Sequence, residues 1–374
     1  MSFAPRDEAD LAECIRAARG PLVIEGSGSK SGVGRPVYGD PLATRALSGI
    51  VDYRPEELVI TARAGTPVEQ IESTLAASRQ RLAFEPPDWR ALLATPQSAA
   101  STIGGVLGAN AAGSRRLVAG AARDHFLGLR AVDGRGVAFK GGGRVVKNVT
   151  GFDLPKLIAG SWGTLAVLTE VSLRAVPMAE TECTVGVGVA DPQAAVALLS
   201  RLMGGAHEIT SAACDPERGA VLLRLEGFRA SVNARLAALA PSLDGDAAGV
   251  VATDDRSRAL WRQIGAGGTV GEARVVWRVC VPPTEAPRVL ATLAPRRWLM
   301  DWAGALLWLG CDAFEPTRVR SAAAPGHATL MKASVGERAS ASAFPPQAAA
   351  IAALAARLKA AFDPQGRLNP GRMD

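Results

Sequence analysis

The chain has 374 residues, enough for two domains, and its 48% of apolar and 21% of charged residues are ordinary for a globular protein, which excludes extensive disorder. The net charge of +6 comes from arginines that are scattered along the chain. Because they form no run of Lys and Arg, we predict that the protein has no nucleic-acid partner.

The N-terminus and the hydropathy pattern bear on where the protein is found. The first twenty residues contain acidic side chains early and no apolar stretch, so we expect no signal peptide. No run reaches the ~18 apolar residues that a membrane-spanning helix needs. We therefore expect a cytoplasmic protein, with peripheral contact to the inner face of the membrane as an alternative.

The cysteines and histidines exclude several kinds of site. Cys14, Cys183, Cys214, Cys280 and Cys311 are far apart and never form a C-x-x-C pair. This argues against a disulfide framework, a zinc site or an iron–sulfur cluster, and we expect buried thiols. The three histidines are similarly isolated, so we predict no metal site.

The first part of the chain alternates helical and strand patterns. The predicted elements are a helix over residues 7–19, strands over residues 21–25 and 57–64, and a helix that opens at Thr66-Pro67. In that second helix Val68, Ile71 and Leu75 share one face, which we expect to be buried. The beginning of the chain is therefore mixed α and β.

Strands continue to residue 177, where the composition changes. The predicted elements are a strand over residues 127–131, a hairpin turn at Asp133-Gly134 into residues 137–140, a half-buried alternating strand over residues 167–173, and helices over residues 191–203 and 347–362. Glycine-rich segments stop after Pro177. We place a domain boundary near residue 178.

The segment GSGSKSGVG, residues 26–34, directly follows a predicted strand. Glycine and serine let consecutive backbone N–H groups point into one concavity, a nest that binds phosphate oxygens. The spacing does not match the G-x-G-x-x-G of a Rossmann turn, and no Gly-Lys-Ser/Thr ends the segment as in a P-loop. Taken by itself, the segment fits a plain glycine turn equally well.

Two further segments of small residues follow. Residues 96–113 combine four glycines with alanines and serines, and such bare backbone lets a flat ring or a pyrophosphate approach closely. The alternative for this segment is a tightly packed contact of a Gly/Ala helix. The third segment, residues 160–164, leads into the alternating strand. Three such segments within 150 residues favour a ligand site over packing alone.

These motifs carry a family resemblance. PLVIEGSGSKSG, STIGGVLGANAAG, RDHFLGLRAVDGRG and KNVTGFDLPKLIAGSWGTLAVLTEVSLRAVP together resemble the FAD-binding domain of the vanillyl-alcohol oxidase and p-cresol methylhydroxylase (PCMH) flavoprotein family. The ending FDPQGRLNPGR, residues 362–372, is similar to that of the lactate and glycolate dehydrogenase branch. DWAGALLWL, residues 301–309, and GHATLMKA, residues 326–333, resemble FAD-binding subunits of bacterial glycolate oxidases. The resemblance covers nearly the whole chain.

The resemblance implies the fold class and the cofactor. We expect an α+β protein with a two-subdomain PCMH-type FAD-binding domain over residues 1–177. A smaller α/β cap domain over residues 178–374 should follow, with a C-terminal tail that returns to the flavin. The family's FAD contacts, carried over to this chain, are Gly26, Ser27, Gly28, Ser29, Lys30, Pro96, Ser101, Thr102, Gly104, Gly105, Asn110, Gly113, Gly163, Thr164, Val167, Thr169 and Asn369.

The chain departs from the family where catalysis is concerned. Catalytic relatives carry a GHxGDGNxH-type stretch with metal-binding or basic histidines, whereas only His327 stands at the comparable place here. A lone histidine is more often structural than basic, so the catalytic base stays unknown. Arg320 and Lys332 are candidates for a substrate carboxylate, with solvated surface as the alternative. The spacing of Trp298, Trp302 and Trp308 favours a helical core stripe.

By resemblance, the chain is the FAD-binding subunit of a complex that oxidises glycolate or a related 2-hydroxy acid. Its expected partners are a larger FAD-containing catalytic subunit and an iron–sulfur subunit. A second hypothesis makes the chain a relay or structural subunit that binds FAD without catalysing the reaction. A third makes it a scaffold without flavin.

Overall fold

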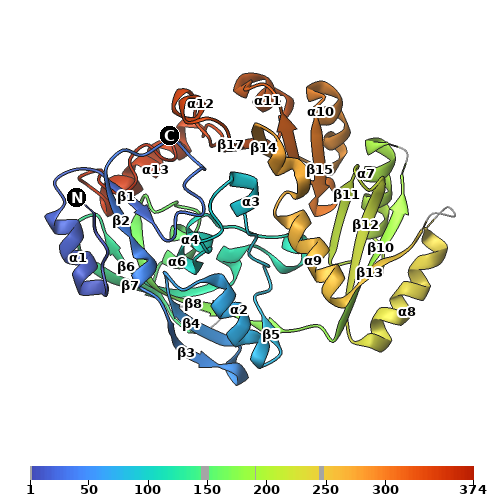
Figure 1. Ribbon diagram of the computed structural model, residues 1–374, viewed down its shortest axis with the longest axis horizontal. Coiled ribbons are helices and arrows are strands. Elements are labelled where there is room, and N and C mark those ends of the chain that lie inside the picture. The colour runs from blue at the N-terminus through green and yellow to red at the C-terminus, as the bar shows by residue number, and fades with distance from the viewer. Residues whose placement is uncertain (1, 145–150, 190, 244–247) are drawn as a thin grey trace.

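The computed structural model describes residues 2–144, 151–189, 191–243 and 248–374 (Figure 1). The beginning of the expected stretch KNVTGFDLP lies outside these residues. Two main sheets organise the described chain. The N-terminal elements surround one sheet and the elements after residue 180 build the other, as the colours of Figure 1 show.

The first sheet has five strands in the order β3-β4-β8-β6-β7. Its strands are β3 (Ile50–Arg54), β4 (Val59–Arg63), β8 (Ala166–Arg174), β6 (Phe126–Asp133) and β7 (Ala138–Gly142). All its pairings are antiparallel, and β6 and β7 form the predicted hairpin. The helices around it are α1 (Glu8–Ala17), α2 (Val68–Ala77), α4 (Ile103–Gly108), α5 (Arg116–Ala119) and α6 (Leu154–Ile158).

The prediction that residues 167–173 form a half-buried strand is wrong. Strand β8 is central in the sheet, and both of its faces are covered. Val167 packs in a cluster with side chains of α1, whereas Leu168 packs in a different cluster with side chains of α4. The polar side chains of Thr169 and Ser172 are buried with their hydroxyl groups hydrogen-bonded: Thr169 donates to Glu8, and Ser172 bonds the hydroxyl of Thr61.

The second sheet has eight strands in the order β13-β10-β12-β11-β15-β16-β14-β17. They are β13 (Gly249–Thr253), β10 (Thr181–Gly188), β12 (Ala220–Gly227), β11 (Ser211–Asp215), β15 (Arg297–Asp301), β16 (Leu306–Cys311), β14 (Val275–Cys280) and β17 (His327–Lys332). The associated helices are α7 (Pro192–Met203), α8 (Arg229–Leu239), α9 (Asp254–Gly265), α10 (Ala286–Leu293), α11 (Pro316–Ala322) and α12 (Val335–Ser340).

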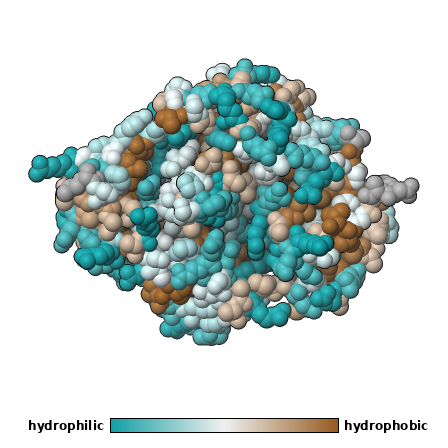
Figure 2. Space-filling view, viewed as in Figure 1, coloured by the Kyte–Doolittle hydropathy of each residue, from teal (hydrophilic) through white to brown (hydrophobic). Residues whose placement is uncertain are grey.

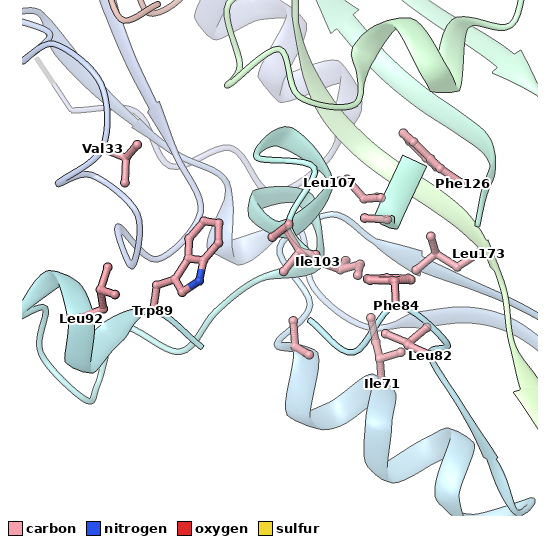
Figure 3. Packing of buried hydrophobic residues seen from close by; sticks show 14 of the residues in the cluster. Val33, Ile71, Leu82, Phe84, Trp89, Leu92, Ile103, Leu107, Phe126 and Leu173 are labelled. Atoms are coloured by element: carbon pink, nitrogen blue, oxygen red, sulfur yellow. The ribbon is translucent and has the colours of Figure 1, made fainter. Parts of the chain in front are cut away.

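One face of this eight-stranded sheet packs toward the N-terminal part of the chain. A continuous cluster of buried side chains includes Phe84 and Ile103 from the first part and Trp261 and Trp308 from the second. Figure 3 shows the N-terminal side of this cluster, where Phe84 lies beside Leu82. The two sheets therefore share a core, and the domain boundary near residue 178 stays a prediction.

The C-terminal tail lies beside strand β1 (Leu22–Glu25), near the beginning of the chain (Figure 1). After α13 (Ala349–Phe362), the tail follows this strand, which pairs in parallel with β2 (Asp40–Ala43). Leu22 donates to the carbonyl of Arg367 at 2.7 Å, and Asn369 donates to the carbonyl of Leu22 at 3.0 Å. The last residues thus lie against the strand that leads into the first glycine loop.

No helix in the described part of the chain is long and apolar enough to cross a membrane. Hydrophilic residues cover much of the face shown in Figure 2, and the apolar patches on it are small and separate.

Candidate functional site

A cleft brings together the first glycine loop, α4, the third glycine turn and the C-terminal tail. We call it the glycine cleft. Its lining residues are Ile24, Glu25, Gly26, Ser27, Gly28, Ser29, Lys30, Ser31, Thr44, Ala64, Thr102, Gly104, Gly105, Gly108, Ala109, Ile158, Ser161, Trp162, Gly163, Ala166, Val167, Leu168 and Arg372.

Most of the cofactor contacts expected from the sequence line this cleft. They are Gly26, Ser27, Gly28, Ser29, Lys30, Thr102, Gly104, Gly105, Gly163 and Val167. The others lie elsewhere. Ser101 accepts a hydrogen bond from Lys30, Asn110 and Gly113 line two other cavities, and the side chain of Thr169 turns toward α1.

Three of the expected contacts hold backbone in place without lining the cleft. The Asn369 side chain accepts from the backbone of Ile24 at 2.8 Å and donates to the carbonyl of Trp162 at 2.8 Å. It therefore ties β1 to the third glycine turn. The carbonyl of Thr164 accepts from Lys359, and that of Pro96 closes a local turn.

Close backbone approach explains the glycines that build the cleft. A Cβ atom at Gly26 would collide with the hydroxyl of Thr102, and one at Gly104 would lie 2.8 Å from the carbonyl oxygen of Ala64. Gly108 is different, because a Cβ there meets no atom within 4 Å. The absence of a side chain at Gly108 leaves open space in the cleft.

The first loop presents donors and positive charge. No described residue accepts a hydrogen bond from the backbone N–H of Ser27, Gly28 or Ser29. Lys30 is buried and donates to Ser101 at 2.5 Å, and burial lowers the pKa of its ammonium group to about 8. Arg372 donates to the carbonyl of Lys30, and its pKa falls to about 10, chiefly through burial.

These features fit the pyrophosphate of FAD. Backbone N–H groups of a nest bind phosphate oxygens, and a buried cation gains more from a phosphate than from the neutral hydroxyl it now contacts. The open space over Gly108 leaves room for a flat ring beside bare backbone. No His or Cys lines the described cleft, so a noncovalently held cofactor fits it.

A second hollow adjoins the glycine cleft and lies between the two sheets. We call it the arginine cavity. Its lining residues are Trp89, Ala109, Asn110, Ala111, Ala112, Arg116, Gly160, Trp162, Arg278, Cys280, Val281, Pro282, Trp302, Ala305, Gly326, His327, Thr329, Met331 and Phe344. Ala109 and Trp162 line both hollows, so the cavity meets the cleft at the third glycine turn.

Two guanidinium groups converge in this cavity around one indole ring. The Arg116 guanidinium lies 4.9 Å from the ring centroid of Trp302, and that of Arg278 lies 4.8 Å from it. Such cation–π contacts hold each cation in place. Burial and the nearby Arg278 charge lower the pKa of Arg116. Two cations that line one cavity favour an anion there.

The cavity also contains a thiol and an imidazole. Cys280 and His327 face each other across the antiparallel pair β14–β17, which places the imidazole beside the thiol. Burial raises the pKa of Cys280, but Arg278, His327 and Arg116 outweigh it, so the pKa is lower than usual. No Asp or Glu is among the described lining residues of the cavity.

The structure corrects the interpretation of the tryptophans. Trp298, Trp302 and Trp308 lie on β15, on a short turn and on β16, so their spacing is not helical. Trp302 and Trp308 both belong to the buried core, as predicted, and Trp302 also lines the arginine cavity. The helical interpretation failed because the three residues belong to a β-hairpin, in which the turn Trp302–Gly304 joins β15 to β16.

The two basic residues named as carboxylate candidates lie outside the described lining of the arginine cavity. Arg320 donates to the carbonyl of Phe344 at 3.2 Å, and Lys332 donates to that of Gly271 at 2.7 Å. Arg116 and Arg278 occupy the cavity in their place. Sequence reasoning missed both, since each is one arginine among many. The only signal was that Arg116 closely follows the second glycine segment.

The expectation of buried thiols holds for two of the five cysteines. All five are free, but only Cys183 and Cys214 are buried, and the other three are partly exposed. Among the described residues, no group of three or more His, Cys, Asp or Glu is arranged to hold a metal ion.

Comparison with known proteins identifies the family. A family model for an FAD binding domain matches residues 1–142, and one for the C-terminal domain of FAD linked oxidases matches residues 347–373. The chain is 35% identical to glycolate oxidase subunit GlcE of Escherichia coli K12, over 94% of this chain and 92% of that protein. It is 33% identical to glycolate oxidase subunit GlcD of Bacillus subtilis, over 49% of this chain and 38% of that protein.

A more distant relative and a solved structure are also similar to this chain. A D-lactate dehydrogenase of Archaeoglobus fulgidus is 32% identical over 41% of this chain and 32% of its own length. The solved structure of an alkyldihydroxyacetonephosphate synthase matches the fold with a TM-score of 0.68 at 14% identity, covering 99% of this chain and 76% of that one. The predicted family, the α+β fold class and the FAD cofactor are confirmed. The chain belongs to the FAD-binding oxidoreductase family that includes the glycolate oxidase subunit GlcE, and its cofactor is FAD.

Proposed function

We propose that this protein is the FAD-binding subunit of a complex that oxidises glycolate, or a related small 2-hydroxy acid, to the 2-oxo acid, and that the substrate binds in the arginine cavity. The observation that carries the proposal is the pair of guanidinium groups of Arg116 and Arg278 beside the end of the glycine cleft. Paired guanidiniums suit a carboxylate, which every 2-hydroxy acid carries.

The cavity residues divide the chemistry between them. When bound, FAD supplies the acceptor for the hydride that leaves the substrate. Arg116 and Arg278 hold the carboxylate and so fix the orientation of the hydroxyl-bearing carbon. His327 takes the hydroxyl proton, because imidazole is the commonest general base and the described lining offers no carboxylate for this role.

The individual FAD contacts are also proposals. The loop Gly26–Lys30 holds the pyrophosphate, and the segments at Thr102–Gly105 and Gly163–Val167 flank the ring system. Pro96, Ser101, Asn110, Gly113, Thr164, Thr169 and Asn369 act by positioning this backbone. The hydrogen bonds of Asn369 to Ile24 and Trp162 support such an indirect role.

The proposed partners are a larger FAD-containing catalytic subunit and an iron–sulfur subunit. The relatives GlcE and GlcD are both described as subunits of a glycolate oxidase, which supports a multisubunit complex. The five free cysteines of this chain are scattered, so a cluster that carries electrons onward belongs to another subunit. We propose a cytoplasmic complex with peripheral membrane contact, and two domains that meet near residue 178.

A second function is supported by the single imidazole in the cavity. In this alternative the chain binds FAD and passes electrons, while its partner oxidises the substrate. The test is the visible spectrum of the purified chain under anaerobic conditions before and after glycolate is added. Bleaching that is lost in Arg278→Gln but kept in the exposed control Arg229→Gln supports catalysis in this chain. If glycolate leaves the flavin spectrum unchanged, the result supports oxidation of the substrate by the partner subunit.

A further inference from the structure

The strand pair β14–β17 places a thiol and an imidazole at one point of the arginine cavity. Cys280 ends β14, His327 begins β17, and the two residues are opposite each other in the ladder. Directly opposed side chains lie on the same face of a sheet and touch. A Cβ atom at Gly326 would overlap the carbonyl oxygen of Cys280, so only glycine lets the chain enter β17 this close to the backbone of β14.

The same face carries positive charge toward the thiol. Residues two apart on a strand share a face, so the Arg278 side chain leaves β14 on the side of Cys280. Arg116 approaches from helix α5 in the first part of the chain, and Trp302 fixes both guanidiniums. The described lining of the cavity contains no carboxylate that would oppose these charges. Nearby cations and an imidazole donor favour the thiolate over the thiol.

The other four cysteines have the opposite surroundings. Burial raises the pKa of Cys14, Cys183 and Cys311, and it raises that of Cys214 to about 12. Acidic side chains near each of them raise it further. Within this protein, therefore, Cys280 is the cysteine whose environment supports a nucleophile.

We propose that Cys280 is a nucleophilic thiolate in a carboxylate-binding cavity, and that it is selectively modified by small carboxylates that carry a leaving group on C2. Arg116 and Arg278 hold the carboxylate of the reagent, which brings C2 to the sulfur. The Cys280 sulfur supplies the electron pair for a new S–C bond while the bond from C2 to the halogen breaks and halide leaves. His327 stabilises the thiolate before the reaction. This inference goes beyond the proposed function, because it concerns a covalent modification and needs no flavin.

The experiment compares iodoacetate with iodoacetamide on the full chain. The two reagents deliver similar alkyl groups, but only iodoacetate carries a carboxylate. We expect iodoacetate to label Cys280 about tenfold faster than it labels Cys311, the partly exposed internal control, as read by mass spectrometry of tryptic peptides. We also expect iodoacetate to react faster than iodoacetamide with Cys280, but not with Cys311.

Variants separate the two parts of the inference. Arg116→Gln and Arg278→Gln should slow iodoacetate at Cys280 while leaving iodoacetamide nearly unchanged, whereas His327→Gln should slow both reagents. Two arginine variants are included in case one fails to fold, which circular dichroism reports. Cys280 labelling no faster than that of Cys311, or no preference for iodoacetate, overturns the inference. Excess glycolate should slow the labelling of Cys280. If glycolate has no effect on labelling, the proposed substrate site is wrong, but the proposal that Cys280 is a nucleophilic thiolate is not contradicted.

Discussion

The hydroxyl of Ser114 donates a 2.7 Å hydrogen bond to the carboxyl of Asp301, which is fully buried. Ser114 follows the second glycine segment, and Asp301 ends strand β15, so the bond joins the two parts of the chain. The same carboxyl accepts the backbone N–H of Trp302 at 2.7 Å. Trp302 holds a left-handed φ of 51°, and its indole donates to the carbonyl of Gly113. Asp301 thereby positions the ring that both cavity arginines contact.

The burial of Asp301 predicts a pH dependence of stability. Burial raises the pKa of this carboxyl from 3.8 to about 7, despite the bonds from Ser114 and Trp302. The folded protein therefore binds the proton more tightly than the unfolded chain does. Below pH 3.8 this carboxyl should make its whole contribution to the free energy of unfolding. That free energy should then fall as the pH rises from 3.8 toward 7, by about 1.4 kcal/mol for each pH unit. Urea unfolding at pH 5 and pH 8 measures this change in the free energy of unfolding, and the change should be smaller in Asp301→Asn. An equal change in the wild type and the variant would contradict the role of Asp301.

Lys30 should govern FAD affinity. Replacement of its buried ammonium group in Lys30→Met removes a charge-assisted bond to phosphate, so we expect FAD to bind about tenfold to a hundredfold more weakly. Because the pKa of Lys30 in the flavin-free protein is about 8, binding to the wild type should weaken above that pH, and binding to the variant should not. Titration by flavin fluorescence measures both effects. The exposed Lys140 on β7 offers the control, since Lys140→Met should bind FAD normally.

Gly108 separates cofactor binding from folding. Because a Cβ there meets nothing within 4 Å, Gly108→Leu should leave the flavin-free fold intact while its side chain fills the cleft. The expected product is a folded, colourless protein that flavin does not stabilise in a thermal melt. The matched control is Gly336→Leu on α12, where a Cβ also meets nothing but lies outside the cleft. A Gly108→Leu protein that is yellow would still bind flavin, and this would show that α4 is not part of the flavin site.

A buried ion network holds the two sheets together. Arg224 on β12 is 1% exposed, and it contacts Glu182 on β10 at 2.7 Å and Glu85 from the first part of the chain at 2.8 Å. Arg224→Met leaves the buried carboxylate of Glu182 and the partly buried carboxylate of Glu85 without this partner. We expect a loss of about 3–5 kcal/mol in the free energy of unfolding.

Chemical denaturation measures this loss, with Arg229→Met as the control. The Arg229–Glu180 pair is largely exposed, and exposed pairs contribute about 0–1 kcal/mol. An Arg224→Met variant as stable as Arg229→Met would show that the network contributes little.

Local patterns predicted much of the fold. The residues expected in the second helix fall in α2, with Val68, Ile71 and Leu75 on its buried face. The turn after Asp133 joins β6 to β7 as expected. These predictions worked because turn residues and apolar periodicity act within a few residues of each other. The burial of β8 could not be predicted in this way, since it depends on what covers each face.

The sequence by itself determined the family, the cofactor and the three glycine segments, because binding FAD with bare backbone leaves runs of small residues that are visible along the chain. Only the tertiary structure decided where the charged side chains meet. Arg116 comes from a short helix after the second glycine segment, Arg278 and Cys280 come from β14, and His327 comes from β17. Strand register and the packing of one sheet against the other bring these four side chains into one cavity. Contacts between residues so far apart in the chain leave no local pattern, and for that reason the sequence did not predict that the lone histidine and the two arginines share one cavity.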